Sequence, residues 1–203
     1  MHTRIKFCGI RSPEHAKFAE DLGVDAIGMV FVPDTPRFID LQTASAICDS
    51  TGPFINRVGL FVNPSADEVM DVLAEVDLDV LQFHGEEAAE FCESFGFPYL
   101  KAVRVQSADQ VIEAAQTHAR ASGLLLDSHS SRAQGGTGET FDWSLIPQVD
   151  KPILLAGGLN PENVAQAIAK VKPYAVDVSS GIESAPGVKD ADRMRAFVSA
   201  VAG

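Results

Sequence analysis

The sequence has few of the residues that build metal centres and disulfide scaffolds. Its 203 residues include five histidines and three cysteines, Cys8, Cys48 and Cys92. The cysteines form no C-x-x-C pair, and no cluster of histidine and cysteine has the spacing of a metal site. An odd number of widely separated cysteines argues against a disulfide framework and favours a reducing compartment. We therefore predict a cytoplasmic protein without a bound metal.

Positive charge and long apolar runs are also scarce. The formal net charge is -12, which argues against nucleic acid or an anionic membrane as a partner attracted by bulk charge. No apolar run approaches the length of a membrane span, and the opening MHTRIKFCGI lacks the apolar core of a signal peptide. We expect a soluble protein that binds neither nucleic acid nor membrane. A small anionic ligand held by backbone amides remains compatible with this charge.

What the sequence has instead is a regular alternation of apolar runs and helical patterns. Ser12, followed by proline, is typical of a helix start, and Ser65 with Glu68 and Ser107 with Gln110 form capping boxes that open two further helices. The predicted strands are residues 4–8, 25–31, 56–62, 80–83, 99–104, 123–127, 152–156 and 175–179. The helix that follows Ser12 covers residues 13–22, and the remaining predicted helices cover residues 41–49, 86–95, 141–146, 160–171 and 190–201.

This alternation predicts the fold class, which is α/β. Consecutive strands must be parallel, because each return to the sheet crosses over through a helix. Eight such units without a linker or a low-complexity segment favour a single (β/α)₈ TIM barrel that spans residues 1–203 as one domain. An open, doubly wound sheet is the alternative, and the absence of a G-x-G-x-x-G after the first strand argues against it.

Functional groups of such a barrel lie where its strands end, and two of them suit proton transfer. Cys8 ends the first strand and shares a face with Lys6, because side chains alternate along a strand. Asp127 ends the sixth strand and faces inward if Leu124 and Leu126 pack outward. A thiol beside a cation can act as a base, and an acid in a partly dry mouth can keep its proton near neutral pH. Cys8 and Asp127 would then face each other across the mouth.

The last two strand ends have the features of a phosphate site. Gly157-Gly158 and Ser180-Gly181 let backbone amides approach an anion closely, and the loops after strands seven and eight often bind phosphate in this fold. The plainer alternative is that both pairs only make tight turns.

The remaining candidates are suited to substrate binding. Arg37 offers a planar fork for a carboxylate, although a loop arginine is often only a solvated charge. His84 would contact a ligand or be a histidine satisfied within its loop. Asp177 is our expected partner for Lys6, which needs a counter-ion if it is buried and charged. Cys8 itself could be an inert buried thiol, as we predict for the other two cysteines.

Six segments, in order along nearly the whole chain, resemble the motifs of the phosphoribosylanthranilate isomerase family. They are KFCGI at 6–10, FVPDTPR at 31–37, QFHG at 82–85, DSHSSRAQGGTGETFDW at 127–143, LAGGLNPEN at 155–163 and VDVSSGIE at 176–183. The sequence departs from the family pattern at Asp34-Thr35, where Lys-Ser is usual, at Phe83 in place of leucine, and at Glu139 in place of a cation. These changes affect the charge of the loops near the mouth and leave the acid and base in place.

The resemblance implies an Amadori rearrangement of a phosphosugar-anthranilate substrate in tryptophan biosynthesis. It implies that Asp127 is the general acid and Cys8 the general base, and that no cofactor is needed. Arg37 would bind the anthranilate carboxylate, and the loops at Gly157-Gly158 and Ser180-Gly181 would bind the phosphate. We expect a monomer or a homodimer.

Two other kinds of protein compete with this interpretation. A related phosphosugar barrel enzyme is the first, but a histidine-pathway isomerase would have an acid in place of Cys8, and a ribulose-phosphate epimerase would have metal-binding histidines. A non-catalytic protein that binds a phosphorylated ligand is the second, and only an activity measurement separates it from an enzyme.

Overall fold

Eight parallel strands close into a barrel in the computed structural model, which describes residues 3–128 and 142–203. Each strand pairs with the next in sequence, and β8 closes the ring by pairing with β1. The predicted (β/α)₈ TIM barrel is therefore confirmed, and the open sheet is excluded. The strands are β1 (Arg4–Cys8), β2 (Ala26–Val30), β3 (Asn56–Phe61), β4 (Val80–Phe83), β5 (Tyr99–Val105), β6 (Gly123–Ser128), β7 (Ile153–Leu155) and β8 (Ala175–Val178).

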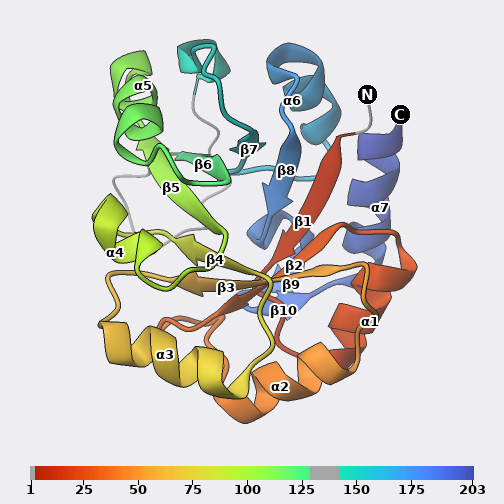
Figure 1. Ribbon diagram of the computed structural model, residues 1–203. Helices are drawn as coiled ribbons and strands as arrows, with labels where there is room; N and C mark the ends of the chain where they lie inside the picture. The colour runs from red at the N-terminus through yellow and green to blue at the C-terminus, as the bar shows by residue number, and fades with distance from the viewer. Residues whose placement is uncertain (1–2, 129–141) are drawn as a thin grey trace.

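The helices lie around the outside of the strands (Figure 1). Capping explains where several of them begin, because Ser12, Ser65 and Ser107 each accept a hydrogen bond from a backbone N–H in the first turn, and the last two form the predicted capping boxes. The α-helices are α1 (Pro13–Asp21), α2 (Leu41–Asp49), α3 (Ala66–Glu75), α4 (Ala89–Glu93), α5 (Ala108–Thr117), α6 (Val164–Val171) and α7 (Ala191–Ala202), and the 3₁₀ turns are η1 (Trp143–Leu145) and η2 (Ser180–Ile182).

Two helices begin later than the sequence pattern indicates. α4 is five residues long, because Glu87, predicted to be helical, instead accepts hydrogen bonds from the backbone amides of Asn63 and Gly85. α6 starts at Val164, because the side chain of Asn160 accepts hydrogen bonds from the next residues and holds them in a turn. In both places, a loop hydrogen bond replaces the first helical turn.

Two further segments differ from the prediction. In place of a helix over 141–146, the structure has the three-residue turn η1, with residue 141 outside the described part. After β8 it has an antiparallel hairpin, β9 (Glu183–Ala185) and β10 (Val188–Lys189), where a loop was expected. This hairpin brings Glu183 and Lys189 to the carboxyl end of the barrel.

Side chains alternate between the inside of the barrel and the layer under the helices. Leu124 and Leu126 pack with α5, whereas Leu125 belongs to a small apolar cluster with Ala102 and Leu154. Because the period along a strand is two, Asp127 points the same way as Leu125, into the barrel. The same alternation turns Lys6 and Cys8 inward, since the residue between them packs against α7.

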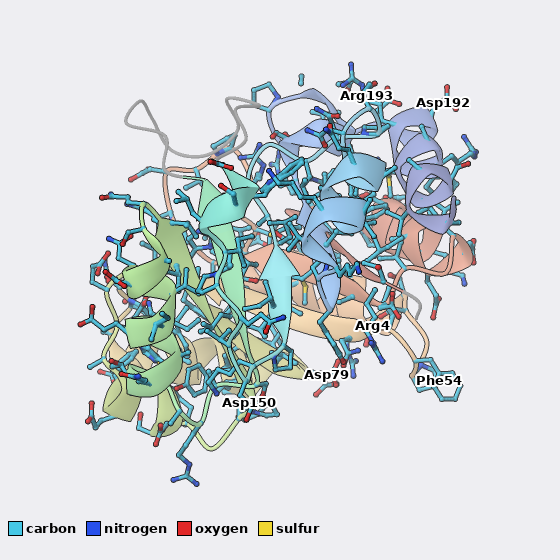
Figure 2. The ribbon with its side chains drawn as sticks, turned by 90° about the horizontal axis from the view of Figure 1, so that it is seen from above. Arg4, Phe54, Asp79, Asp150, Asp192 and Arg193 are labelled. Carbon is cyan, nitrogen blue, oxygen red and sulfur yellow. The ribbon has the colours of Figure 1, made fainter. Side chains whose placement is uncertain are left out.

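The two ends of the barrel are separated along the strand direction. Figure 2 shows Arg4, Phe54, Asp79 and Asp150, which precede or begin strands, at one edge, and Arg193, in the first turn of α7, at the opposite edge. Helices thus start at the carboxyl end of the strands and run back toward the amino end. No described helix has the length and apolar character needed to span a bilayer.

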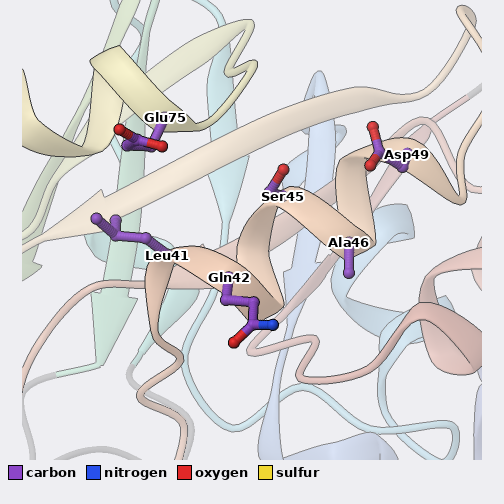
Figure 3. Close-up of a pocket in the computed structure, with 6 residues that line it drawn as sticks. All are labelled: Leu41, Gln42, Ser45, Ala46, Asp49 and Glu75. Atoms are coloured by element: carbon purple, nitrogen blue, oxygen red, sulfur yellow. The ribbon is translucent and has the colours of Figure 1, made fainter.

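A groove of about 450 Å³ runs along the outer surface of α2. Figure 3 shows its lining side chains, five from α2 and Glu75 from the end of α3. None of the sequence-predicted site residues lines it. The predicted site residues lie instead where the barrel strands end.

Candidate active site

The two predicted proton-transfer residues lie at the same end of the barrel. Cys8 is the last residue of β1, and Asp127 is the next-to-last residue of β6. All eight strands are parallel, so their carboxyl ends share one face, and the alternation described above directs both side chains toward the interior. β1 and β6 are well separated in the closed ring. A thiol and a carboxyl group therefore approach the mouth from different walls.

Cys8 is buried, and its sulfur lies beside the ammonium group of Lys6. Burial raises the pKa of the Cys8 thiol above its ordinary value; Lys6 opposes this effect, Asp177 adds to it, and Lys189 opposes it. The cations expected near a reactive thiol are therefore present, but burial outweighs them. Gly28, the register partner of Cys8 on β2, provides the space, since a Cβ there would lie 3.0 Å from both Sγ of Cys8 and Nζ of Lys6.

Lys6 forms the ion pair that the sequence predicted. Its Nζ donates to Oδ1 of Asp177 at 2.6 Å, with the two side chains only 2% and 9% exposed. Burial lowers the pKa of Lys6, but Asp177 and Cys8 outweigh it and leave the pKa above its ordinary value. Asp177 is adjacent because β1 and β8 pair with Lys6 opposite Asp177. Its carboxylate is therefore engaged with Lys6 at the base of the site.

His84 connects the carboxyl group to a buried amide. Its Nε2 lies 3.2 Å from Oδ2 of Asp127, and its Nδ1 lies 3.2 Å from Nε2 of Gln82, which points into the barrel from β4. Because the Gln82 amide nitrogen can only donate, Nδ1 of His84 accepts from it, and the ring proton on Nε2 is donated to Asp127. The ring nitrogens of His84 contact Asp127 and Gln82, and contact with a ligand stays a prediction. Gln82 stood inside a quoted motif but was assigned no role from the sequence.

A buried ion pair holds the turn that carries His84. Nζ of Lys101 on β5 donates to the carbonyl of Gly85 at 2.5 Å and to Oε2 of Glu87 at 2.8 Å. The Glu87 carboxylate also accepts from the Gly85 amide. Burial raises the pKa of Glu87, but Lys101 and the backbone amides outweigh it, and the pKa is below its ordinary value.

The guanidinium fork of Arg37 is occupied by a carboxylate from the chain itself. Nε donates to Oε1 of Glu183 at 2.8 Å and Nη2 donates to Oε2 at 2.7 Å. Nζ of Lys189 also donates to Oε1 of Glu183, at 2.8 Å. Burial raises the pKa of Glu183, but Arg37 and Lys189 overcome it and hold the pKa at about 2. Glu183 stood inside a quoted motif and Lys189 outside any motif, so only the hairpin reveals their role.

The two glycine-containing loops meet at the predicted phosphate site. Gly157 and Gly158 both have positive φ, at 78° and 67°, a conformation that glycine adopts at little cost. Gly181 approaches the other loop so closely that a Cβ would lie 2.0 Å from the carbonyl oxygen of Leu159. The loops after β7 and β8 are thus brought together, with Ser180 next to Gly181 at the start of η2.

Some expectations fall on residues that the structure does not describe. The glycine-rich loop at 135–138 and residue 139, where the sequence departs from the family pattern, lie outside the described residues. Within residues 3–128 and 142–203, no group of three or more His, Cys, Asp or Glu is arranged to hold a metal ion.

Comparison with known proteins gives matches along almost the entire chain. A family profile described as N-(5'phosphoribosyl)anthranilate (PRA) isomerase matches residues 5–200. The chain is 52% identical over 202 residues to the N-(5'-phosphoribosyl)anthranilate isomerase of Pseudomonas syringae pv. tomato, an alignment that covers 99% of this chain and 98% of the relative.

Solved structures give the same result. The crystal structure of phosphoribosyl anthranilate isomerase from Thermotoga maritima is similar with a TM-score of 0.89 and 40% identity, covering 99% of each chain. A second structure, of a phosphoribosyl anthranilate isomerase in complex with reduced 1-(o-carboxyphenylamino)-1-deoxyribulose 5-phosphate, is similar with a TM-score of 0.85 and 38% identity, again covering 99% of each chain.

Proposed function

This chain belongs to the N-(5'-phosphoribosyl)anthranilate isomerase family, and on that premise we propose that it converts N-(5-phosphoribosyl)anthranilate to 1-(2-carboxyphenylamino)-1-deoxyribulose 5-phosphate by acid–base catalysis. The protein is an isomerase of tryptophan biosynthesis. The proposed product is supported by a relative of the same length and fold, whose crystal structure holds the reduced form of that compound. Acid and base suffice for this Amadori rearrangement, so the proposal includes no cofactor.

Asp127 acts as the general acid in the first step. It protonates the furanose ring oxygen, the C1′–O bond breaks, and the anilino nitrogen supplies the electron pair that forms the Schiff base. The inward direction of Asp127 and the contact with His84 support this assignment. His84 donates from Nε2 to Oδ2 of Asp127, and this contact holds the carboxyl group in position while it gives its proton to the ring oxygen.

Cys8 acts as the general base in the second step. The thiolate takes the proton from C2′, and the C–H electron pair forms the C1′–C2′ double bond while the iminium nitrogen becomes neutral. The resulting enolamine relaxes to the ketone. The position of Cys8 at the end of β1, with Lys6 beside its sulfur, supports this assignment.

Binding groups hold the two charged ends of the substrate. Nε and Nη2 of Arg37 are bound to Glu183, so we assign the anthranilate carboxylate to Nη1 of the same guanidinium. The loops at Gly157-Gly158 and Ser180-Gly181 take the phosphate. A substrate fixed at both ends would present its ribose to the acid and the base.

One observation carries the proposal. A buried thiol with an adjacent ammonium group and a carboxyl group with an adjacent imidazole occur at the carboxyl ends of two different strands of one closed barrel. A metal-dependent epimerase or a binding protein does not require this combination.

Turnover of freshly prepared phosphoribosylanthranilate, followed as loss of its anthranilate-type fluorescence, tests the function. We expect wild-type turnover and a loss of activity on the order of 10³-fold for Cys8→Ser and for Asp127→Asn. Phosphate affinity without turnover would favour a binding protein, and turnover restricted to a histidine-pathway substrate would favour the sister isomerase. Full activity of either variant would refute the role of that residue.

We propose in addition that the protein works in the cytoplasm as a monomer or a homodimer, with no nucleic acid or membrane partner. Light scattering of the purified protein measures its mass against the 21.6 kDa of one chain, and a higher oligomer would contradict this.

A further inference from the structure

We propose that Lys6 is a positioning residue that acts through Cys8: its ammonium group, fixed by Asp177, stabilises the thiolate that takes the substrate proton. This inference rests on the proposed function, in which Cys8 is the base. It assigns a role to a buried lysine that the acid–base mechanism does not otherwise use.

The burial of Lys6 requires an explanation beyond packing. An ammonium group that is 2% exposed loses almost all its hydration, and this loss is strongly unfavourable unless partners replace the water. Asp177 accepts one of the three N–H donors, and the sulfur of Cys8 interacts with the same ammonium group. Lys6 therefore lies between the side chain of Asp177 and a thiol that can gain negative charge.

A glycine on the neighbouring strand β2 leaves room for this contact. Gly28 is the register partner of Cys8, and a Cβ at that position would lie 3.0 Å from both the sulfur and the ammonium nitrogen. That separation is shorter than ordinary van der Waals contact, so any side chain would push the two groups aside. A glycine in the middle of a buried strand usually weakens packing. Here it leaves the space in which Nζ reaches Sγ.

The charges around Cys8 favour its ionised form. Three cations face it: Lys6 on its own strand, Lys189 on β10 and Arg37 in the loop after β2. Two carboxylates accompany them, Asp177 with Lys6 and Glu183 with the other two cations. With a neutral thiol the group therefore carries one net positive charge. With a thiolate it is neutral, so these charges oppose the effect of burial, which still keeps the pKa of Cys8 above its ordinary value.

The proton transfer leaves Lys6 unchanged. The proton moves from C2′ to the sulfur, and the carbon–hydrogen electron pair forms the double bond of the enolamine. Lys6 keeps its three protons, and its role is to stabilise the anion before the transfer. A purely structural pair between β1 and β8 would hold the strands together without affecting the ionisation of Cys8, so a titration separates the two roles.

The test is the pH titration of Cys8 by thiolate absorbance at 240 nm, taken as the difference between each protein and the same protein carrying Cys8→Ser. Burial raises the pKa of Cys48 to about 11 and that of Cys92 to about 12, and the difference removes their signal. We expect Lys6→Met to raise the midpoint by at least about one pH unit, a tenfold loss of thiolate at a given pH. Lys6→Arg should keep the midpoint close to the wild-type value, because it retains a cation beside the sulfur.

Lys101→Met is the matched control, because Lys101 is also buried and paired with a carboxylate, at 6% exposure, but lies on the helix-facing side of β5. It should leave the Cys8 midpoint unchanged. If Lys6→Met does not fold, Lys6→Gln, which keeps an N–H donor for Asp177, carries the test. In the wild-type protein, the ¹⁵N signal of the Lys6 ammonium should shift at the midpoint of the Cys8 titration.

The outcomes distinguish this inference from the proposed function. The inference would be overturned if folded Lys6 variants kept the wild-type midpoint of Cys8. It would also be overturned if the ¹⁵N signal of Lys6 did not change across the Cys8 titration. Both results hold whatever the activity of Cys8→Ser. A shifted midpoint together with full turnover of Cys8→Ser would support the coupling of Lys6 to Cys8 but remove Cys8 from the mechanism.

Discussion

Replacing Glu183 with glutamine tests how strongly the hairpin after β8 is tied to the barrel. The carboxylate binds two nitrogens of Arg37 and the ammonium of Lys189, and its side chain is only 4% exposed. Glutamine keeps the shape of the side chain and removes the charge. Glu183→Gln therefore resembles the protonated form of the wild-type residue.

The magnitude follows from the pKa of Glu183, which falls from 4.5 to about 2 in the folded protein. At about 1.4 kcal/mol per pKa unit, ionised Glu183 contributes roughly 3 kcal/mol to the free energy of unfolding. Because the folded pKa lies below the unfolded one, this contribution is complete above pH 4.5 and is lost as the pH falls toward 2. The difference between wild type and Glu183→Gln should follow the same course.

Urea unfolding at a series of pH values measures this difference. We expect about 3 kcal/mol between pH 5 and 7, decreasing by about 1.4 kcal/mol per pH unit below pH 4.5. Glu162→Gln, at an exposed position at the start of the α6 turn, is the control and should change the free energy of unfolding by less than about 0.5 kcal/mol. A difference for Glu183→Gln below about 1 kcal/mol at pH 7, or one that does not change between pH 5 and 3, would refute the reasoning.

Three further predictions concern other parts of the barrel. Ser65→Ala removes a capping box and should lower the free energy of unfolding by about 1 kcal/mol; no change in urea unfolding would contradict this. Lys101→Met leaves the buried carboxylate of Glu87 without its cation and should lower the free energy of unfolding by about 3–5 kcal/mol in the same assay. A decrease below about 1 kcal/mol would contradict this. Gly28→Ala places a methyl group between Lys6 and Cys8 and should lower turnover at least about tenfold with the fold retained by circular dichroism; wild-type turnover would show that the contact has no role.

The architecture could be predicted from the sequence because local residue patterns specify it. Strand periodicity and capping residues placed β1, β4 and α2 at their observed bounds. Alternation along β1 also identified the inward face of Lys6 and Cys8, and the need of a buried cation for a counter-ion identified Asp177. Each of these inferences uses only residues that are near in sequence or fixed by the closure of the barrel.

The rest of the site depends on contacts that no local pattern specifies. Arg37 and Glu183 are 146 residues apart, and Glu183 begins the hairpin of β9 and β10 that follows β8. Helix α4 begins later than predicted because the Glu87 carboxylate accepts a hydrogen bond from the backbone amide of Asn63, 24 residues earlier. Helical propensity is a weak preference of a few tenths of a kcal/mol per residue, and one buried charged hydrogen bond outweighs it.

The central claim is that Cys8 removes the substrate proton at a mouth shared with Asp127. Single-turnover reaction of substrate carrying deuterium at C2′ measures that step directly. We predict that wild-type enzyme releases the label to solvent with a primary isotope effect, and that Cys8→Ser slows release on the order of 10³-fold while Schiff-base formation, followed by absorbance, proceeds. Release of the label by Cys8→Ser at the wild-type rate would contradict the claim.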